Sequence, residues 1–189
     1  MGDLMEKHKD YLLLWGGVDI NPEIYKQQPH PNTQRPNNHR DLTEIMAVRE
    51  AIDNGIPIIG VCRGAQLLCA LNGGTLYQHT NDHGCSHDVY TDDQHGHIEI
   101  IKRVAAGHHQ VMNPKGNFVV YGYDGRESTV YESDGSVAIK LEHAPEVVWW
   151  PDTKCLGIQP HPEWMPSNYP FNIWINKLIF ELTGLQGVF

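Results

Sequence analysis

The sequence predicts an α/β fold with a mostly parallel central sheet, and two kinds of pattern lead to this prediction. Residues 56–61 form a continuous apolar run, which is typical of a strand buried on both faces of a parallel sheet. Helix-compatible segments stand on either side of this run, at residues 42–53 and 65–71. Strand and helix patterns that alternate in this way indicate parallel strands joined through helices. At 189 residues, the chain is expected to form one domain, 1–189, with a substantial core.

Local signals predict the remaining elements. Residues 11–15 are expected to form a short apolar strand that ends at a Gly-Gly turn. The helix over 42–53 has Asp41 as its expected N-cap, with Glu44 at capping-box spacing, and Asn54-Gly55 ends it. Strands are also expected over 97–101, 117–123, 136–142 and 146–150, and a last amphipathic helix over 171–182.

The most informative segment is Gly60-Val61-Cys62-Arg63-Gly64, where a buried strand meets a helix at a cysteine. The flanking glycines permit a tight backbone, as in the nucleophile elbow of serine hydrolases, here with sulfur in place of oxygen. The thiol also lies at the positive end of the following helix, where unpaired N–H groups favour the thiolate. A buried structural cysteine at the end of a core strand is the alternative interpretation.

A second candidate segment is Gln159-Pro160-His161-Pro162-Glu163, near the other end of the chain. Its two prolines favour extended backbone, in which residues two apart point the same way. We therefore expect His161 and Glu163 to lie on a common side, where the imidazole would take a proton from a thiol and the carboxylate would orient the ring. In a chain with 12 histidines, a surface turn with an incidental histidine is the alternative.

Together, these two segments resemble those of the class I glutamine amidotransferase superfamily, whose members share a Cys-His-Glu triad. Residues 16–25 resemble a signature of its γ-glutamyl hydrolase branch (peptidase C26), which includes the γ-glutamyl-γ-aminobutyrate hydrolases. Arg40-Asp41 with Glu44, and residues 73–78, resemble two further segments of that branch. The resemblance implies a flavodoxin-like, three-layer fold with helices on both faces of the sheet and the site at the carboxyl ends of the strands.

The chain departs from this family in two respects. Relatives carry a βα portion of several dozen residues before the Gly-Gly turn, so the fold is expected to be N-terminally shortened, either as a compact variant or because the recorded start is internal. Loss of that portion would expose a sheet edge, and we expect a partner subunit of a homo-oligomer to cover it. Family members also carry a serine where this chain has Ala106, so a shifted substrate specificity is expected.

The resemblance implies a role for each site residue. Cys62 would attack the γ-carbonyl of a small γ-glutamyl conjugate, or of glutamine, to form a γ-glutamyl thioester. His161 would act as general base and then as acid, with Glu163 orienting it. The backbone of Arg63 and the turn at Gly16 and Gly17 would form the oxyanion hole. The candidates for substrate binding are Gln66, His108, His109 and Gln110. The alternative is that these residues are solvated surface positions.

Potential metal ligands crowd residues 79–97, namely His79, Asp82, His83, Cys85, His87, His95 and His97. Such density can indicate zinc, but the sequence contains no Cys-x₂-Cys pair here and no His-x₃-His pair on a clear helix. His83 and His87 could still chelate a metal from a loop. Because the family needs no metal or other cofactor for its chemistry, we expect none, and a loop that contacts the substrate is the preferred interpretation.

Composition limits the partners and the location. The net charge of −9 argues against a nucleic-acid surface, and no apolar run approaches the roughly 18 residues of a membrane span. Half of the first ten residues are charged, unlike a secretory signal, and four cysteines are too few for a disulfide scaffold. We therefore expect a soluble, cytoplasmic hydrolase. The alternatives are a glutaminase subunit that delivers ammonia to a separate synthetase, and an inactive binding module on the same fold.

Overall fold

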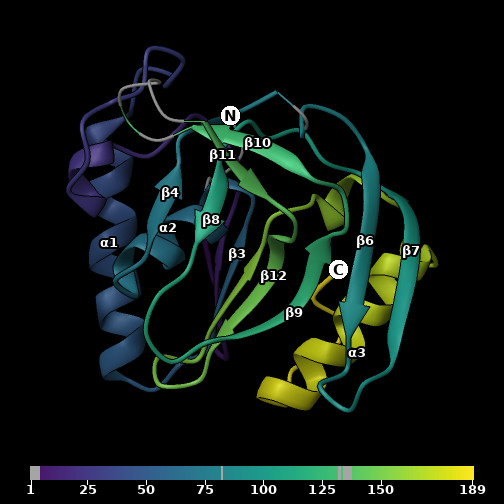
Figure 1. Ribbon diagram of the computed structural model, residues 1–189. Helices are drawn as coiled ribbons and strands as arrows, with labels where there is room; N and C mark the ends of the chain where they lie inside the picture. Colours follow the sequence, from purple (N-terminus) through teal and green to yellow (C-terminus); the bar gives the residue numbers. More distant parts are fainter. Residues whose placement is uncertain (1–4, 82, 132, 134–137) are drawn as a thin grey trace.

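The computed structural model describes residues 5–81, 83–131, 133 and 138–189, and it consists of sheets with helices packed against them (Figure 1). In chain order, the elements are β1 (Met5–Lys7), β2 (Leu12–Leu14), η1 (Pro22–Tyr25), α1 (Asn38–Asp53), β3 (Ile58–Val61), α2 (Arg63–Leu71), β4 (Thr75–Tyr77), β5 (His79–Thr80), β6 (His87–Asp92), β7 (Ile98–Val104), β8 (Val111–Asn113), β9 (Val119–Asp124), β10 (Ser128–Tyr131), β11 (Ala138–Leu141), β12 (Ala144–Trp150), β13 (Cys155–Ile158), η2 (Pro162–Trp164) and α3 (Pro170–Thr183).

The large central sheet has eight strands in the order β1-β2-β3-β13-β12-β9-β6-β7. β2, β3 and β13 are parallel neighbours, whereas the other pairings described in this sheet are antiparallel. Two smaller sheets, β11-β10-β5 and β4-β8, accompany it. The predicted α/β class is confirmed, and the parallel pairing lies in the strands that lead to Cys62 and His161.

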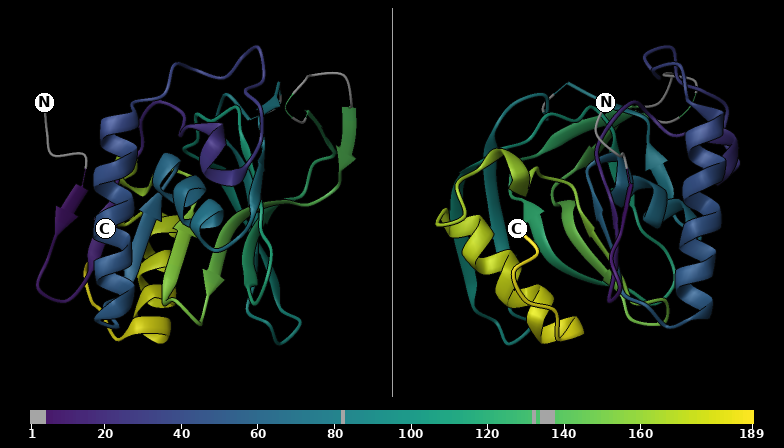
Figure 2. Two further views of the ribbon diagram at one scale, coloured as in Figure 1. Left: turned by 90° about the vertical axis from the view of Figure 1, so that its left-hand side faces the viewer. Right: turned by 180° about the vertical axis from the view of Figure 1, so that it is seen from behind.

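Alternating side chains of β2 show how the two faces of the sheet are filled. Leu12 and Leu14 pack into a core with α1 and α2, while Leu13 packs into a second core with α3. This division follows from strand geometry, because successive side chains point to opposite faces. Figures 1 and 2 show α1 and α2 on one side of the sheet and α3 on the other. The three-layer prediction is confirmed.

The outer edge of β2 is covered from within the chain. β1 pairs with it in antiparallel register, from Met5 opposite Leu14 to Lys7 opposite Leu12, and is the outermost strand in the left view of Figure 2. The preceding residues thus supply the strand beside β2, and β1 itself becomes the edge of the sheet. Cover of that edge by a partner subunit of a homo-oligomer stays a prediction.

Helix α1 begins at Asn38 rather than at the predicted Leu42. Its N-cap is Asn37, whose side-chain oxygen accepts a hydrogen bond of 3.2 Å from the N–H of Arg40. Asp41, the predicted N-cap, is buried in the first turn and forms an ion pair with Arg63. The prediction was wrong because Asn37 caps the helix earlier in the chain, and the carboxylate of Asp41 instead pairs with a buried guanidinium from a distant segment.

Most of the other predicted elements are present with shifted ends. The elements that overlap predicted segments are β2, β3, α2, β7, β9, β12 and α3. β11 overlaps the strand predicted over 136–142, and the first residues of that prediction lie outside the described ranges. β4, β5, β6, β8, β10 and β13 were not predicted. None of the helices in the described ranges is long and apolar enough to cross a membrane.

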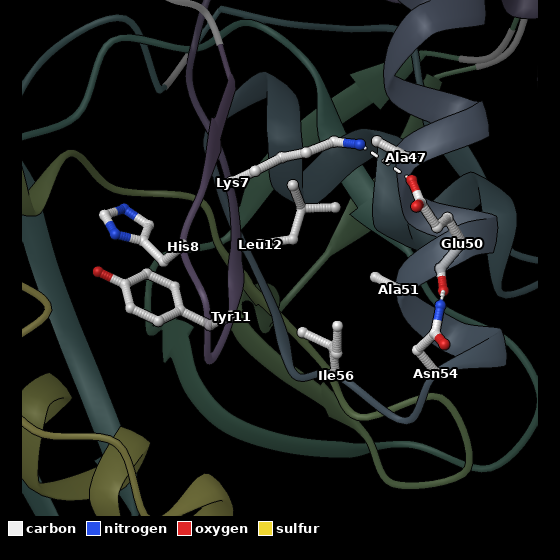
Figure 3. Close-up of a pocket in the computed structure, with 9 residues that line it drawn as sticks. All are labelled: Lys7, His8, Tyr11, Leu12, Ala47, Glu50, Ala51, Asn54 and Ile56. Carbon is white, nitrogen blue, oxygen red and sulfur yellow. Dashed lines mark hydrogen bonds and ion pairs between the residues drawn. The ribbon is translucent and has the colours of Figure 1, made fainter.

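A small hollow of about 110 Å³ lies between the β1–β2 hairpin and α1 (Figure 3). An ion pair of 2.9 Å between Lys7 Nζ and Glu50 Oε2 crosses it. Tyr11 and Ile56, which precede β2 and β3, also line the hollow. It therefore lies at the amino ends of the parallel strands, opposite the end at which Cys62 and His161 follow.

Candidate active site

Cys62 occupies a strained turn between β3 and α2. Its φ is 50° and its ψ is −106°, a conformation that costs an L-residue about 1–3 kcal/mol. Two glycines make the turn sterically feasible. A Cβ added to Gly60 would come within 2.5 Å of the Gly64 backbone, and one added to Gly64 would overlap the carbonyl of Leu14. The strand, sharp turn and helix predicted around this cysteine are therefore present.

His161 follows β13, and its ring is held on two sides. Nδ1 lies 2.7 Å from Oε1 of Glu163. The ring stacks on Trp164 with centroids 3.5 Å apart and planes within 2° of parallel. Because Nδ1 is engaged, Nε2 is the nitrogen left for proton exchange. The prediction that His161 and Glu163 share a side is confirmed, and a surface turn is excluded because His161 is only 4% exposed.

Gly16 is the place where the early and late segments meet. A Cβ built on Gly16 would lie 2.9 Å from Cε1 of His161 and 3.6 Å from Cβ of Cys62. This convergence follows from the parallel pairing of β2, β3 and β13, because the carboxyl ends of parallel strands meet at one edge. A pocket of about 390 Å³ opens there, lined by Trp15, Gly16, Gly17, His161, Glu163 and Trp164.

The Gly16-Gly17 turn is fixed by Arg40. Nη2 of Arg40 donates a hydrogen bond of 2.8 Å to the carbonyl of Trp15, and Nη1 donates one of 3.0 Å to the carbonyl of Gly16. In a trans peptide the N–H points opposite to the C=O, so the N–H groups of Gly16 and Gly17 are directed away from Arg40. Gly17 has a φ of 151°, and a Cβ there would collide with the guanidinium.

A buried network of ion pairs links this turn to the residue after Cys62. The Arg63 guanidinium, only 1% exposed, pairs with Asp41 and Glu44. Glu44 also pairs with Arg40, at 2.7 Å between Oε1 and Nε. Sequence reasoning assigned Asp41 and Glu44 to the start of a helix and missed this network. The signal that could have found it is Arg63 itself, because an arginine beside a core strand needs buried carboxylate partners.

Burial raises the pKa of the Cys62 thiol to about 12. The backbone N–H of Arg63 lowers it, whereas the carboxylates of Glu163, Glu146 and Asp19 raise it further. The predicted effect of the helix N-terminus is present in the N–H of Arg63, but loss of hydration outweighs it and the net shift disfavours the thiolate. The thiol is protonated at neutral pH, so its sulfur needs a base to take its proton before it can attack.

The predicted substrate-binding residues are mostly buried. Gln66 is 3% exposed, and its Nε2 lies 3.5 Å from the carbonyl oxygen of Gln110 and 3.4 Å from Oε1 of Gln159. The alternative of a solvated position is wrong for Gln66. His108 and Gln110 are also buried, whereas His109 is half-buried with its Nε2 3.1 Å from Oδ2 of Asp19. The pocket beside His161 is lined by other residues.

The histidine-rich span separates into different environments. His83 and His87 are buried and meet His108 and Glu146, with one ligand atom from each residue within 4.8 Å of the others. Burial lowers the pKa of His108 to about 4. The other candidates are scattered. His79 stacks on His30. The exposed candidates are Cys85, His95 and His97, and Asp82 lies outside the described residues. Sequence reasoning did not connect Glu146 with this cluster.

The layered α/β fold is that of class I glutamine amidotransferase-like proteins. A family model described as Peptidase C26 matches residues 3–163. The chain therefore belongs to the peptidase C26 family.

Individual relatives agree with this assignment. The γ-glutamyl-γ-aminobutyrate hydrolase PuuD of Escherichia coli strain K12 is 25% identical over 174 residues, which cover 86% of this chain and 65% of that protein. Protein NtpR of Enterococcus hirae is 48% identical over 69 residues, which cover 36% of this chain and 29% of that protein. The chain thus spans less than two thirds of the length of these relatives.

A solved structure supports the fold. A Thermoplasma acidophilum protein provisionally named as part of a GMP synthase superposes with a TM-score of 0.58 at 17% identity, over 93% of this chain and 73% of that one.

Proposed function

We propose that the chain is a cysteine-dependent hydrolase that cleaves the γ-glutamyl amide bond of a small γ-glutamyl conjugate and releases glutamate and an amine. The observation that carries this proposal is the meeting of Cys62 and His161 against Gly16, with Glu163 held 2.7 Å from Nδ1 of the imidazole. Membership of the peptidase C26 family and similarity to the Escherichia coli hydrolase support the substrate class.

In the first step, the sulfur of Cys62 attacks the γ-carbonyl carbon while the thiol proton passes to Nε2 of His161. Because burial raises the pKa of this thiol, its sulfur depends on the imidazole to accept the proton. Glu163 stabilises the imidazolium that forms. The oxyanion accepts hydrogen bonds from the backbone N–H groups of Arg63 and Gly17, the latter directed away from Arg40.

In the second step, the tetrahedral intermediate collapses and the C–N bond breaks. The departing amine takes the proton from Nε2 of His161, which leaves a γ-glutamyl thioester on Cys62. A water molecule then attacks the thioester carbonyl and gives a proton to His161. Release of glutamate returns that proton to the sulfur, and the protein is restored.

The test is turnover by the purified full chain, without any partner, of γ-glutamyl-γ-aminobutyrate, of other γ-glutamyl amines and of glutamine. We expect glutamate and free amine from conjugates, and no activity in Cys62→Ala. Cys69→Ala is the matched control, because Cys69 is an equally buried cysteine on the adjoining helix. Full activity in Cys62→Ala would refute the proposal. Silence on every conjugate, with glutamine hydrolysed only after a synthetase is added, would favour the ammonia-delivering role instead.

A further inference from the structure

A second constellation of chemically active side chains lies in the interior, outside the pocket beside His161. It consists of His83, His87, His108 and Glu146, of which none is more than 4% exposed. His83 precedes β6 and His87 begins it, His108 lies in the loop between β7 and β8, and Glu146 is in β12. Separate segments of the chain therefore deliver these four groups to one buried point.

The atoms that these residues turn toward one another make no hydrogen bond of good geometry among the described residues, although the imidazole nitrogens lie within ion-pair distance of Oε1 of Glu146. They are Nδ1 of His83, Nε2 of His87, Nε2 of His108, and Oε1 and Oε2 of Glu146. A buried polar atom without a well-formed hydrogen bond is unfavourable, because it loses its hydration and regains only part of that free energy. Several of them at one point indicate a missing positively charged partner.

The opposite nitrogen of each imidazole is already engaged. Nε2 of His83 lies 2.8 Å from Oγ of Ser128. Nδ1 of His87 lies 3.2 Å from the carbonyl oxygen of Cys85, and Nδ1 of His108 lies 2.9 Å from that of Gln110. A carbonyl oxygen only accepts, so His87 and His108 donate from Nδ1 and present the lone pair of Nε2 to the centre. Metal-binding histidines are typically oriented in this way by their second nitrogen.

The distances from Glu146 are close to those around a tetrahedral ion. Ligands held at about 2.0–2.1 Å from zinc lie about 3.3 Å from one another in a tetrahedron. Oε1 of Glu146 lies 3.4 Å from Nδ1 of His83, 3.3 Å from Nε2 of His87 and 3.7 Å from Nε2 of His108. All four ligand atoms lie within 4.8 Å of one another, so the side chains would draw closer around a bound ion.

We propose that His83, His87, His108 and Glu146 form a buried site for a divalent transition-metal ion, with Zn²⁺ as the expected occupant. Three imidazoles and one carboxylate are a donor set that suits zinc. Because protein atoms fill all four positions and solvent is excluded, the site is structural and leaves no open position for a substrate. This assignment departs from the expectation of a metal-free, substrate-contacting loop.

The metal site is joined to the proposed active site through hydrogen bonds. The carbonyl oxygen of Gln110 that accepts from His108 also lies 3.5 Å from Nε2 of Gln66, one helical turn after Cys62. The carbonyl of Glu146 accepts a hydrogen bond of 2.7 Å from the N–H of Gln159, shortly before His161. The ion would therefore brace both segments that carry the reacting side chains.

Metal analysis of the purified full chain tests this proposal. After expression with added zinc and dialysis, we expect about one zinc per chain in the wild type. His97→Ala, which removes an exposed histidine of the same span, should keep this content. The double variant His87→Ala/Glu146→Gln should lose most of it. Equal metal content in the wild type and the double variant would overturn the site.

A second measurement decides the matter even if the ligand variants do not fold. Wild-type protein stripped with a chelator should show a Tm that rises with added Zn²⁺, because the ion binds only the folded state. Added Co²⁺ should give the intense visible absorption of tetrahedral coordination. Unfolding on chelation with recovery on zinc addition would also support the site. A metal-free wild type whose Tm does not respond to Zn²⁺ would overturn the site. That result is expected if a shared proton, rather than a metal ion, joins the histidines to Glu146.

Discussion

Replacement of Gly16 by alanine should disable the active site and leave the fold intact. The added Cβ would lie 2.9 Å from Cε1 of His161, whereas ordinary contacts begin at 3.4 Å. The imidazole cannot yield easily, because it stacks on Trp164 at 3.5 Å and is bound to Glu163 at 2.7 Å. The ring must therefore be displaced by about 0.5–1 Å, or lose one of these two contacts.

The expected cost follows from this displacement. Misplacing a reacting group by about 1 Å can lower the rate about 10²-fold, which corresponds to about 2.7 kcal/mol in the barrier. Stability should change little, because Gly16 does not have the left-handed backbone that disfavours alanine. The kcat/KM for hydrolysis of a γ-glutamyl amide measures the first effect, and thermal unfolding measures the second.

Gly107→Ala is the matched control. Its added Cβ would meet the ring of Trp164 at 3.4 Å, an ordinary contact on the same side chain that supports His161. This variant should keep activity close to that of the wild type. A folded Gly16→Ala protein with unchanged kcat/KM would refute the reasoning, and so would equal losses in the two variants.

Three further predictions concern the charges and thiols around the site. Glu163→Gln should lower kcat by about 10²-fold or more, because the imidazolium loses its counter-ion; steady-state kinetics near the wild-type rate would contradict this. Glu44→Ala removes a carboxylate from buried guanidinium groups and should lower the free energy of unfolding by about 3–5 kcal/mol. Glu50→Ala, the control, removes an exposed ion pair on the same helix and should lower it by less than about 1 kcal/mol. Denaturant unfolding measures both, and equal losses would count against the buried network. Iodoacetamide at neutral pH should alkylate exposed Cys85 well before buried Cys62. Labelling of Cys62 should accelerate as the pH rises toward the pKa of its thiol, about 12. Peptide mapping that finds Cys62 labelled first would contradict the effect of burial.

Features carried by neighbouring residues could be predicted from the sequence. The elbow depends on Gly60, Cys62 and Gly64, which stand within one short segment, and steric reasoning about glycine is enough to predict it. His161 and Glu163 stand two residues apart, so local backbone geometry predicts their hydrogen bond. The α/β class follows in the same way from runs of apolar residues.

Features that depend on distant segments could not be predicted in this way. Arg63 meets Glu44 only after α1 packs beside α2, and this contact turns a predicted capping residue into a buried ion. His108 joins His83 only when the loop after β7 folds over the sheet. The net shift in the pKa of Cys62 could not be predicted for a related reason, because the helix N-terminus is visible in the sequence and the depth of burial is not.

The covalent intermediate gives the most direct test of the proposed chemistry. Wild-type protein mixed with a γ-glutamyl amide is quenched with acid during turnover, and its intact mass and peptides are analysed. We predict one added glutamyl group on the peptide that contains Cys62, released by hydroxylamine as expected for a thioester and absent in Cys62→Ala. A glutamyl group on another residue, or turnover that persists in Cys62→Ala, would contradict the account.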